Sequence, residues 1–192
     1  MKRLAVALAL VLCFVLSFSS CSIQGGGKLA FYSNENGTCS VSIGTCSAKK
    51  ISIPERSPEG ELVIGINYGG FAFSDELSSI KIPDSVETIK EKAFQGCSSL
   101  SSVTIGVGVK QIMGSAFADC GKLTTISYQG TQAQWNKILL GSGWDLNTGD
   151  YIIQCTDGTQ VKGTESSTQS NNSGGTLAED GWDEFHFGPL EN

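Results

Sequence analysis

Residues that could carry catalysis are few in this chain and poorly placed for it. The only histidine, His186, lies beside the acidic residues Asp183 and Glu184 in the C-terminal tail. A Ser-His-Asp or Cys-His arrangement needs the histidine held next to the nucleophile inside a folded domain. A structural zinc ion needs about four well-placed ligands. The sequence therefore predicts no enzyme, no cofactor and no metal site.

The reactive side chains that remain are seven cysteines, and the first two belong to the N-terminal segment. Lys2 and Arg3 precede an apolar run at residues 4–16. That run is too short to cross a membrane, which takes about 20 apolar residues. A positive start followed by such a run is typical of a signal peptide, which we expect to span residues 1–20.

Cys21 follows directly, in the sequence Ser-Phe-Ser-Ser-Cys. This pattern resembles the lipobox of bacterial lipoproteins, although Phe18 stands where that motif usually has an aliphatic residue. The resemblance implies that Cys21 is the first mature residue and carries a lipid, with residues 21–28 as a tether. Several acyl chains on one residue anchor a protein stably in a membrane. The alternative is ordinary secretion, with cleavage near Ser20 and a free thiol on Cys21.

The net charge of −6 and the lack of a basic cluster argue against one class of partner. Nucleic-acid binding depends on Lys and Arg side chains that neutralise phosphates. We therefore expect no nucleic acid among the partners of this protein.

Four apolar columns repeat with a period of 23 residues in the middle of the chain. Their members are Phe71, Phe94 and Phe117; Leu77, Leu100 and Leu123; Ile80, Val103 and Ile126; and Ile82, Ile105 and Tyr128. A fixed period of about 20 to 50 residues is the signature of a solenoid. An incomplete copy precedes them, because Ile51 and Ile53 match Ile80 and Ile82 once an insertion of six residues near 57–60 is allowed.

Within one repeat the pattern predicts two elements. In residues 100–105 apolar side chains alternate with Thr104, as a strand with one buried face requires. Ile89, Ala93 and Phe94 have the spacing of a short helical turn, which would cover the other side of the core. We therefore predict an α+β fold, a short solenoid with repeats of about 23 residues.

Residues 93–105 (AFQGCSSLSSVTI) resemble the repeat of the BspA-like leucine-rich-repeat family, and residues 116–123 (AFADCGKL) repeat its core. The first copy departs from the pattern, since Ser74 stands where the later copies have cysteine. The resemblance spans roughly residues 31–158. It implies a leucine-rich-repeat solenoid and a role in protein binding, because the family includes bacterial cell-surface adhesins that contact host matrix proteins or other bacteria.

Five cysteines fall within this region, so at least one thiol is free. Cys97 and Cys120 share a column and are expected to be small buried side chains. Coils about 5 Å apart would also permit a disulfide between them. Cys39 and Cys46 are the better candidate pair, because export permits oxidation. The sequence leaves both pairings open.

The ends of a solenoid need caps, because an end coil otherwise exposes core and open strand edges. At the N-terminal end, residues 28–53 predict a hairpin cap, in which Asn36 and Gly37 supply the tight turn. At the C-terminal end, Thr131 and Gln134 fit a capping box that opens a helix.

This helix would place Trp135, Ile138 and Leu139 on one face. We expect Trp135 and Trp144 to form a lid over the last coil. A final strand at residues 151–155 would complete a helix-strand cap.

The patterns divide the chain into four segments. They are a lipoprotein signal peptide at residues 1–20, a tether at 21–28, the repeat domain with its caps at 29–158, and a disordered acidic tail at 159–192. The tail is rich in Ser, Thr, Asn and Gly, a composition that cannot bury enough apolar surface to fold. Its end also carries Trp182, Phe185 and Phe187, so the alternative is a short segment that docks on a partner or on the solenoid.

The outward residues of the strands are the remaining candidates for binding. If Ile80, Val103 and Ile126 point inward, their polar neighbours point outward. This candidate binding face comprises Lys50, Ser52, Ser79, Lys81, Ser102, Thr104, Thr125 and Ser127. A strip of small polar side chains lacks the aromatic and Arg anchors of binding hot spots, so a purely solvated face is the alternative.

Two functions are compatible with these expectations. The first is a surface lipoprotein of the outer membrane or cell surface, which binds a protein ligand in adhesion and contacts the membrane through its lipid anchor. Its ligand would be a host matrix protein or a bacterial surface protein. The second is a periplasm-facing structural or scaffolding lipoprotein of the envelope.

Overall fold

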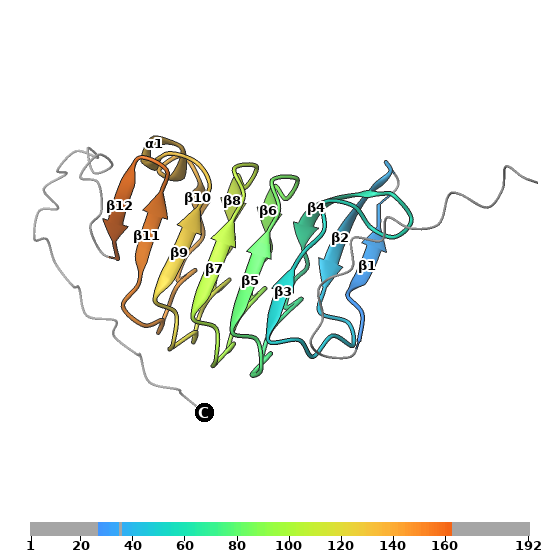
Figure 1. Cartoon of the computed structure of the whole chain (residues 1–192), viewed down its shortest axis with the longest axis horizontal. Helices are drawn as coiled ribbons and strands as arrows, with labels where there is room; N and C mark the ends of the chain where they lie inside the picture. The colour runs from blue at the N-terminus through green and yellow to red at the C-terminus, as the bar shows by residue number, and fades with distance from the viewer. Residues whose placement is uncertain (1–26, 35, 163–192) are drawn as a thin grey trace, which may run out of the picture.

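The computed structural model describes residues 27–34 and 36–162 as a β-solenoid of about five coils, each crossing two sheets (Figure 1). Sheet A contains, in spatial order, β1 (Ala30–Ser33), β2 (Thr38–Ser42), β4 (Leu62–Ile66), β6 (Thr88–Ile89), β8 (Gln111–Ile112) and β10 (Leu139–Leu140). Sheet B contains β3 (Lys50–Ser52), β5 (Ser79–Ile82), β7 (Ser102–Ile105), β9 (Thr125–Tyr128), β11 (Ile152–Cys155) and β12 (Gly158–Val161). One short helix, α1 (Gln132–Trp135), lies between β9 and β10.

Neighbouring coils pair in parallel with the register that the 23-residue period predicts. In sheet B, Ile80 lies opposite Val103, and Val103 lies opposite Ile126. β3 joins the same sheet with Ile51 opposite Ile80. This pairing confirms the incomplete first copy and its insertion.

The apolar columns form one continuous core between the two sheets. Phe71, Phe94 and Phe117 are fully buried, and their rings stack with centroids 5.2 and 5.0 Å apart. Identical side chains stack in this way because each coil repeats the geometry of the coil before it. The Leu and Ile columns are buried alongside them, as the sequence predicts.

The expected helical turns do not occur in the described residues, so the α+β class is not confirmed. Ile89 lies in the two-residue strand β6, while Ala93 and Phe94 lie in the turns that follow. Lys92 and Gly96 have positive φ angles of 58° and 70°, a backbone conformation that interrupts a right-handed helix. The spacing of the apolar residues here reflects burial between turns.

The same two positions carry left-handed backbone in coil after coil. Positive φ angles occur at Gly69, Lys92, Ser115 and Gly143, and again at Phe73, Gly96, Asp119 and Asn147. The connections that follow β4, β6, β8 and β10 therefore each bend at two such points, which closes the coil without a helix.

The N-terminal cap is the predicted hairpin. β1 and β2 are antiparallel, and Gly37 in the turn between them has a φ of 72°. β2 then continues sheet A by pairing in parallel with β4. Val41 is fully buried and Phe31 is half-buried, so the hairpin covers the first coil.

The C-terminal helix begins at the predicted capping box but is shorter than expected. The Thr131 side chain accepts from the Gln134 backbone, and the Gln134 side chain accepts from the Thr131 backbone. α1 has only four residues. Leu139, predicted on its buried face, lies in β10 and is 67% exposed. Its backbone N–H donates to the carbonyl of Lys110, which draws the chain back into sheet A.

Trp135 and Trp144 form the predicted lid. Both side chains are buried. Trp144 meets the last stacked ring, Phe117, edge-on at 6.1 Å, and Trp135 meets Tyr128 at 5.5 Å. The two indoles therefore close the end of the core.

Sheet B ends in a strand that the sequence did not predict. β11 is the expected final strand, but the chain reverses and returns antiparallel as β12. Lys162 Nζ donates to the backbone carbonyl and hydroxyl of Thr148, which fixes the end of β12. The domain boundary predicted after residue 158 thus falls within this hairpin.

The signal peptide, Cys21, most of the tether and residues 163–192 of the predicted tail lie outside the described residues. Within residues 27–34 and 36–162, no helix is long and apolar enough to cross a membrane.

Candidate protein-binding face

The eight residues predicted to face outward lie together on the outer face of sheet B. They form two rows across the strands, one of Lys50, Ser79, Ser102 and Thr125 and one of Ser52, Lys81, Thr104 and Ser127. Neighbours within a row belong to adjacent strands, about 4.8 Å apart. The structure brings together every residue that the sequence assigned to this face, while protein binding there stays a prediction.

Alternation along each strand creates this face. The inward residues Ile51, Ile80, Val103 and Ile126 are at most 3% exposed, whereas the outward residues beside them are exposed or half-buried. Successive side chains of a strand point to opposite sides of the sheet. The same pattern that builds the core therefore leaves the opposite side free.

The outer face of sheet B differs in charge from the chain as a whole. The chain carries a net charge of −6, yet none of the six strands of sheet B contains Asp or Glu. Lys50 and Lys81 are the charged residues of these strands, and neither forms an ion pair with a described residue. The result is a polar, weakly cationic strip that suits a neutral or acidic surface.

A column of hydroxyl groups, which sequence reasoning missed, fixes the start of the strands. Ser78 Oγ donates to the carbonyl of Lys49 at 2.8 Å. Ser101 and Thr124 repeat the contact one and two coils later, each donating at 3.1 Å to the coil before it. These three residues are spaced by 23 in the sequence, and this spacing could have revealed the column. The contacts hold the register on which the outer rows depend.

The face extends further than predicted at its C-terminal end. Gln154 lies in register with Ser127, and Thr159 lies opposite Gln154. Ile152 and Val161 pair in the same way and continue the other row with apolar side chains. The β12 residues were missed because that strand lacks a clear alternating pattern. The face thus runs from a cationic end to an apolar end.

Two cysteines contribute to the core rather than to a reactive site. Cys97 Sγ donates to the carbonyl of Phe71 at 3.1 Å, and Cys120 Sγ donates to that of Phe94 at 3.2 Å. The hydrogen bond with Cys97 and burial together raise the pKa of Cys120, which keeps this thiol protonated. The pair are small buried side chains, as expected, and no disulfide joins them.

The other described cysteines are also free. Cys39 and Cys46 are buried and do not form the disulfide that the sequence left open. Burial raises the pKa of Cys39 and of Cys155. Because the thiolate is the reactive form, the thiols of Cys39 and Cys155 are poor nucleophiles at neutral pH.

No group of three or more His, Cys, Asp or Glu side chains in the described residues could hold a metal ion. Carboxylates at the turns have structural contacts instead. Asp84 accepts from the backbone of Val107 at 2.9 Å, and Glu87 pairs with Lys110 at 2.9 Å.

The repeat geometry agrees with the comparison to known families. The sequence matches the BspA-type leucine-rich repeat region in six copies over residues 64–138. Residues 64–138 belong to the BspA-type leucine-rich repeat family. Solenoids of repeats present extended surfaces that commonly bind other proteins.

Two solved structures of leucine-rich repeat proteins have a fold similar to that of this chain. A leucine-rich repeat protein from Bacteroides ovatus has a TM-score of 0.52 and 22% identity, over 68% of this chain and 36% of its own. A T. pallidum leucine-rich repeat protein has a TM-score of 0.52 and 19% identity, over 60% of this chain and 63% of its own. At these identities the likeness concerns the fold alone, and this chain spans only part of both relatives. No curated protein matches the sequence.

Proposed function

We propose that this BspA-type repeat protein is a non-enzymatic module that binds a protein partner on the outer face of sheet B, displayed from a membrane by a lipid on Cys21. The observation that supports this proposal is the continuous face itself, with two rows of outward residues in register. Its two lysines and lack of carboxylates suit a neutral or acidic partner surface. Adhesion at the cell surface, to a host matrix protein or a bacterial surface protein, is the favoured role.

The size of the face sets the expected strength of binding. Six strands about 4.8 Å apart and about four residues long give an area of roughly 300 Å². A standard interface takes about 800 Å² per partner, so one copy should bind weakly. Display of many copies on a membrane raises avidity by about 10² to 10⁴ without new contacts.

A bead-adhesion assay tests this proposal. Beads densely coated with the full chain should adhere to immobilised matrix proteins, whereas the soluble monomer should bind them no tighter than micromolar. Thr104→Tyr and Lys81→Ala on sheet B should each weaken adhesion. Thr88→Tyr supplies a matched control, because Thr88 lies in β6 of the opposite sheet. Nanomolar binding by the monomer that neither Thr104→Tyr nor Lys81→Ala weakens would contradict the proposal.

The anchoring and orientation of the protein are tested separately. Cys21→Ala should move the protein from the detergent phase to the soluble fraction if Cys21 carries the lipid. Protease added to intact cells should then cleave the wild-type protein if it faces outward. Membrane retention of the Cys21→Ala variant would refute the lipid anchor, and full protection from protease would favour the periplasm-facing scaffold.

A further inference from the structure

The connection between β9 and β10 differs from those in the two coils that precede it. β5 joins β6, and β7 joins β8, through five residues each (83–87 and 106–110). β9 joins β10 through ten residues (129–138), which include α1. The longer connection cannot stack directly on the shorter one beneath it. A pocket of about 300 Å³ lies between them.

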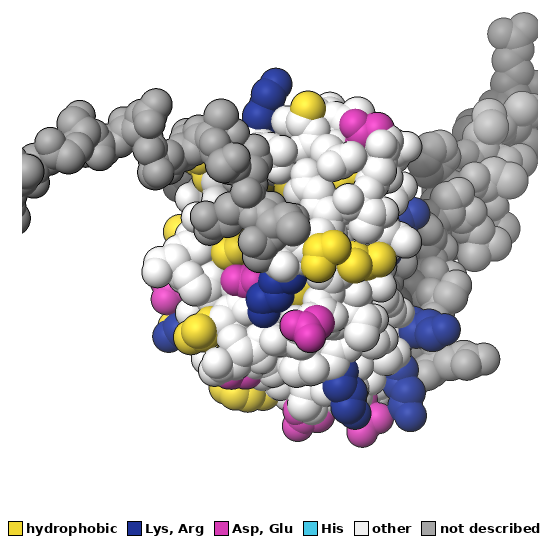
Figure 2. Space-filling model, turned by 90° about the vertical axis from the view of Figure 1, so that its left-hand side faces the viewer, with side chains coloured by type: hydrophobic (Ala, Val, Ile, Leu, Met, Phe, Trp, Pro, Cys, Tyr) yellow, Lys and Arg dark blue, Asp and Glu magenta, His cyan; other side chains and the backbone are white. Residues whose placement is uncertain are grey.

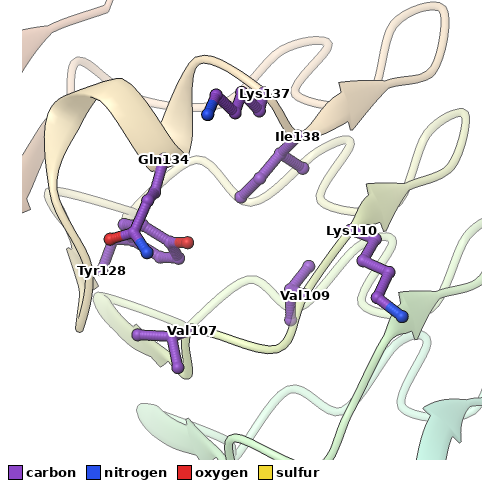
Figure 3. Close-up of a pocket in the computed structure, with 7 residues that line it drawn as sticks. All are labelled: Val107, Val109, Lys110, Tyr128, Gln134, Lys137 and Ile138. Atoms are coloured by element: carbon purple, nitrogen blue, oxygen red, sulfur yellow. The ribbon is translucent and has the colours of Figure 1, made fainter.

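The pocket has an apolar lining and a basic rim. Figure 3 shows Val107, Val109, Tyr128 and Ile138 around the space, with Lys110 and Lys137 at its edges. Val107 is 44% exposed although it is apolar. The volume lies near the lower end of the range for ligand pockets, about 300–1,000 Å³. It suits one or two side chains of a peptide rather than a folded domain.

One cation at the rim has no local partner. Lys110 pairs with Glu87 at 2.9 Å, and the carboxylate of Asp84 accepts from the backbone of Val107. Lys137 forms no ion pair with any described residue. An occupant with aromatic and acidic side chains would therefore satisfy both the apolar lining and Lys137.

Exposed apolar side chains gather at the same end of the solenoid. Leu139, Leu140, Leu146 and Val161 are between 45% and 67% exposed, and all four lie in or after β10. Figure 2, which views this end, shows hydrophobic side chains on the surface among lysines and carboxylates. An apolar surface of this kind often marks an interaction site.

We propose that residues 182–187 of this same chain dock into the pocket beside α1. This segment, Trp-Asp-Glu-Phe-His-Phe, combines three aromatic side chains with two carboxylates. The aromatic rings match the apolar lining, and Asp183 or Glu184 matches Lys137. The inference is independent of binding on sheet B, because none of the residues that line the pocket belongs to the two rows of that face.

The length of the intervening chain permits this contact. The described chain ends at Lys162, beside Thr148, so residues 163–181 link it to the docking segment. A random-coil linker of nineteen residues has a root-mean-square span of about 22–26 Å, and a four-residue strand is only about 13 Å long. A short flexible linker gives an effective concentration in the millimolar range. Even a weak contact is therefore substantially occupied.

Hydrogen exchange of the full chain tests the docking. Amides at residues 106–110 and 134–138 should exchange about two- to tenfold more slowly in the wild type than in the triple variant Trp182→Ala/Phe185→Ala/Phe187→Ala. Val107→Asp should abolish this difference. Tyr32→Asp is the matched control, because Tyr32 is similarly exposed but lies in β1 at the other end. Trp182 fluorescence, measured as the difference from Trp182→Phe, should also be shielded from acrylamide.

A charge exchange tests the ionic contact. Lys137→Glu should reduce the protection, and adding Asp183→Lys and Glu184→Lys should restore it. Equal exchange in the wild type and the triple variant would overturn the proposal. Protection that grows with protein concentration would also overturn it, because the occupant would then be a second copy of the chain.

Discussion

The central coils and the C-terminal end close the same core by different means. In the centre, Phe71, Phe94 and Phe117 stack with ring planes 22° and 11° apart. At the end, Trp144 meets Phe117 at 88°, edge to face. A repeated coil presents the same side chain at the same place, so parallel stacking is available. A terminal coil has no further copy above it and needs large side chains that turn across the opening.

The end also depends on polar contacts that occur once and are not repeated from coil to coil. Tyr151 packs against Trp144 at 6.1 Å, and its hydroxyl donates to Asp145 at 2.7 Å. Lys162 lies 3.9 Å from the same carboxylate. A side chain with an apolar body and a polar tip can cover a core while its tip reaches a partner. Repetition thus stabilises the middle, and single amphipathic residues stabilise the end.

The largest effect is expected in the central stack. Phe94→Ala removes the ring that contacts both Phe71 and Phe117, and it should lower the free energy of unfolding by about 3–5 kcal/mol. Thr104→Ala, on the outer face of sheet B, should change it by less than about 0.5 kcal/mol. Denaturant titration measures both. Equal, small losses would mean that the core of the repeat is assigned to the wrong side chains.

A smaller effect is expected at Gly96, where the turn has left-handed backbone. Gly96 has a φ of 70°, and a Cβ there would lie 2.6 Å from the ring of Phe73. Left-handed backbone costs other residues about 1–2 kcal/mol, so Gly96→Ala should lower the free energy of unfolding by at least that amount, with the contact to Phe73 adding to it. Adding Phe73→Ala to this variant should recover only the part of the loss that comes from the contact between the new Cβ and the Phe73 ring. Gly121→Ala is the control, since a Cβ at Gly121 meets nothing within 4 Å. Similar losses at both glycines would contradict this explanation.

The smallest effect concerns the end of the solenoid. Tyr151→Phe removes the hydrogen bond to Asp145 and should cost about 1 kcal/mol at neutral pH. Burial and that hydrogen bond raise the pKa of Tyr151 above its usual value. In the unfolded chain the phenol of Tyr151 therefore loses its proton near pH 10, whereas in the folded chain it keeps the proton to higher pH. Above about pH 10 the stabilisation that Tyr151 supplies declines as the pH rises.

Denaturant titrations from pH 8 to 11 check the pH effect. Wild-type stability should fall more steeply above about pH 10 than that of Tyr151→Phe. Tyr32→Phe is the control, because Tyr32 is 54% exposed. Parallel pH profiles for wild type and Tyr151→Phe would contradict the claim that the raised pKa of Tyr151 causes the loss of stability.

Repetition explains why the sequence predicted the core and the outer rows. Phe94 and Val103 recur at a fixed period, and a fixed period specifies register directly. The short strands β6 and β8 of sheet A were missed because a segment as short as Thr88–Ile89 has no alternation to detect. The apolar spacing there matched a helix, but Lys92 and Gly96 adopt left-handed backbone.

The unrepeated parts were only partly predictable. The capping box at Thr131 correctly located the start of α1, but it does not specify where a helix ends. β12 was missed because Gly158–Val161 lacks an apolar pattern and pairs through its backbone. The sequence did not predict the pocket beside α1, because the pocket arises from a difference in length between neighbouring connections and not from a repeated pattern.

The opposite orientation of Val103 and Thr104 is the central claim, because both the core and the candidate binding face depend on it. The most direct measurement is the maleimide labelling rate of Val103→Cys and Thr104→Cys in the folded full chain, each compared with the parent protein. Thr104→Cys, which is partly exposed, should label in the folded protein, while Val103→Cys should label only through unfolding. Equal rates, or faster labelling of Val103→Cys, would contradict the assignment of the two faces.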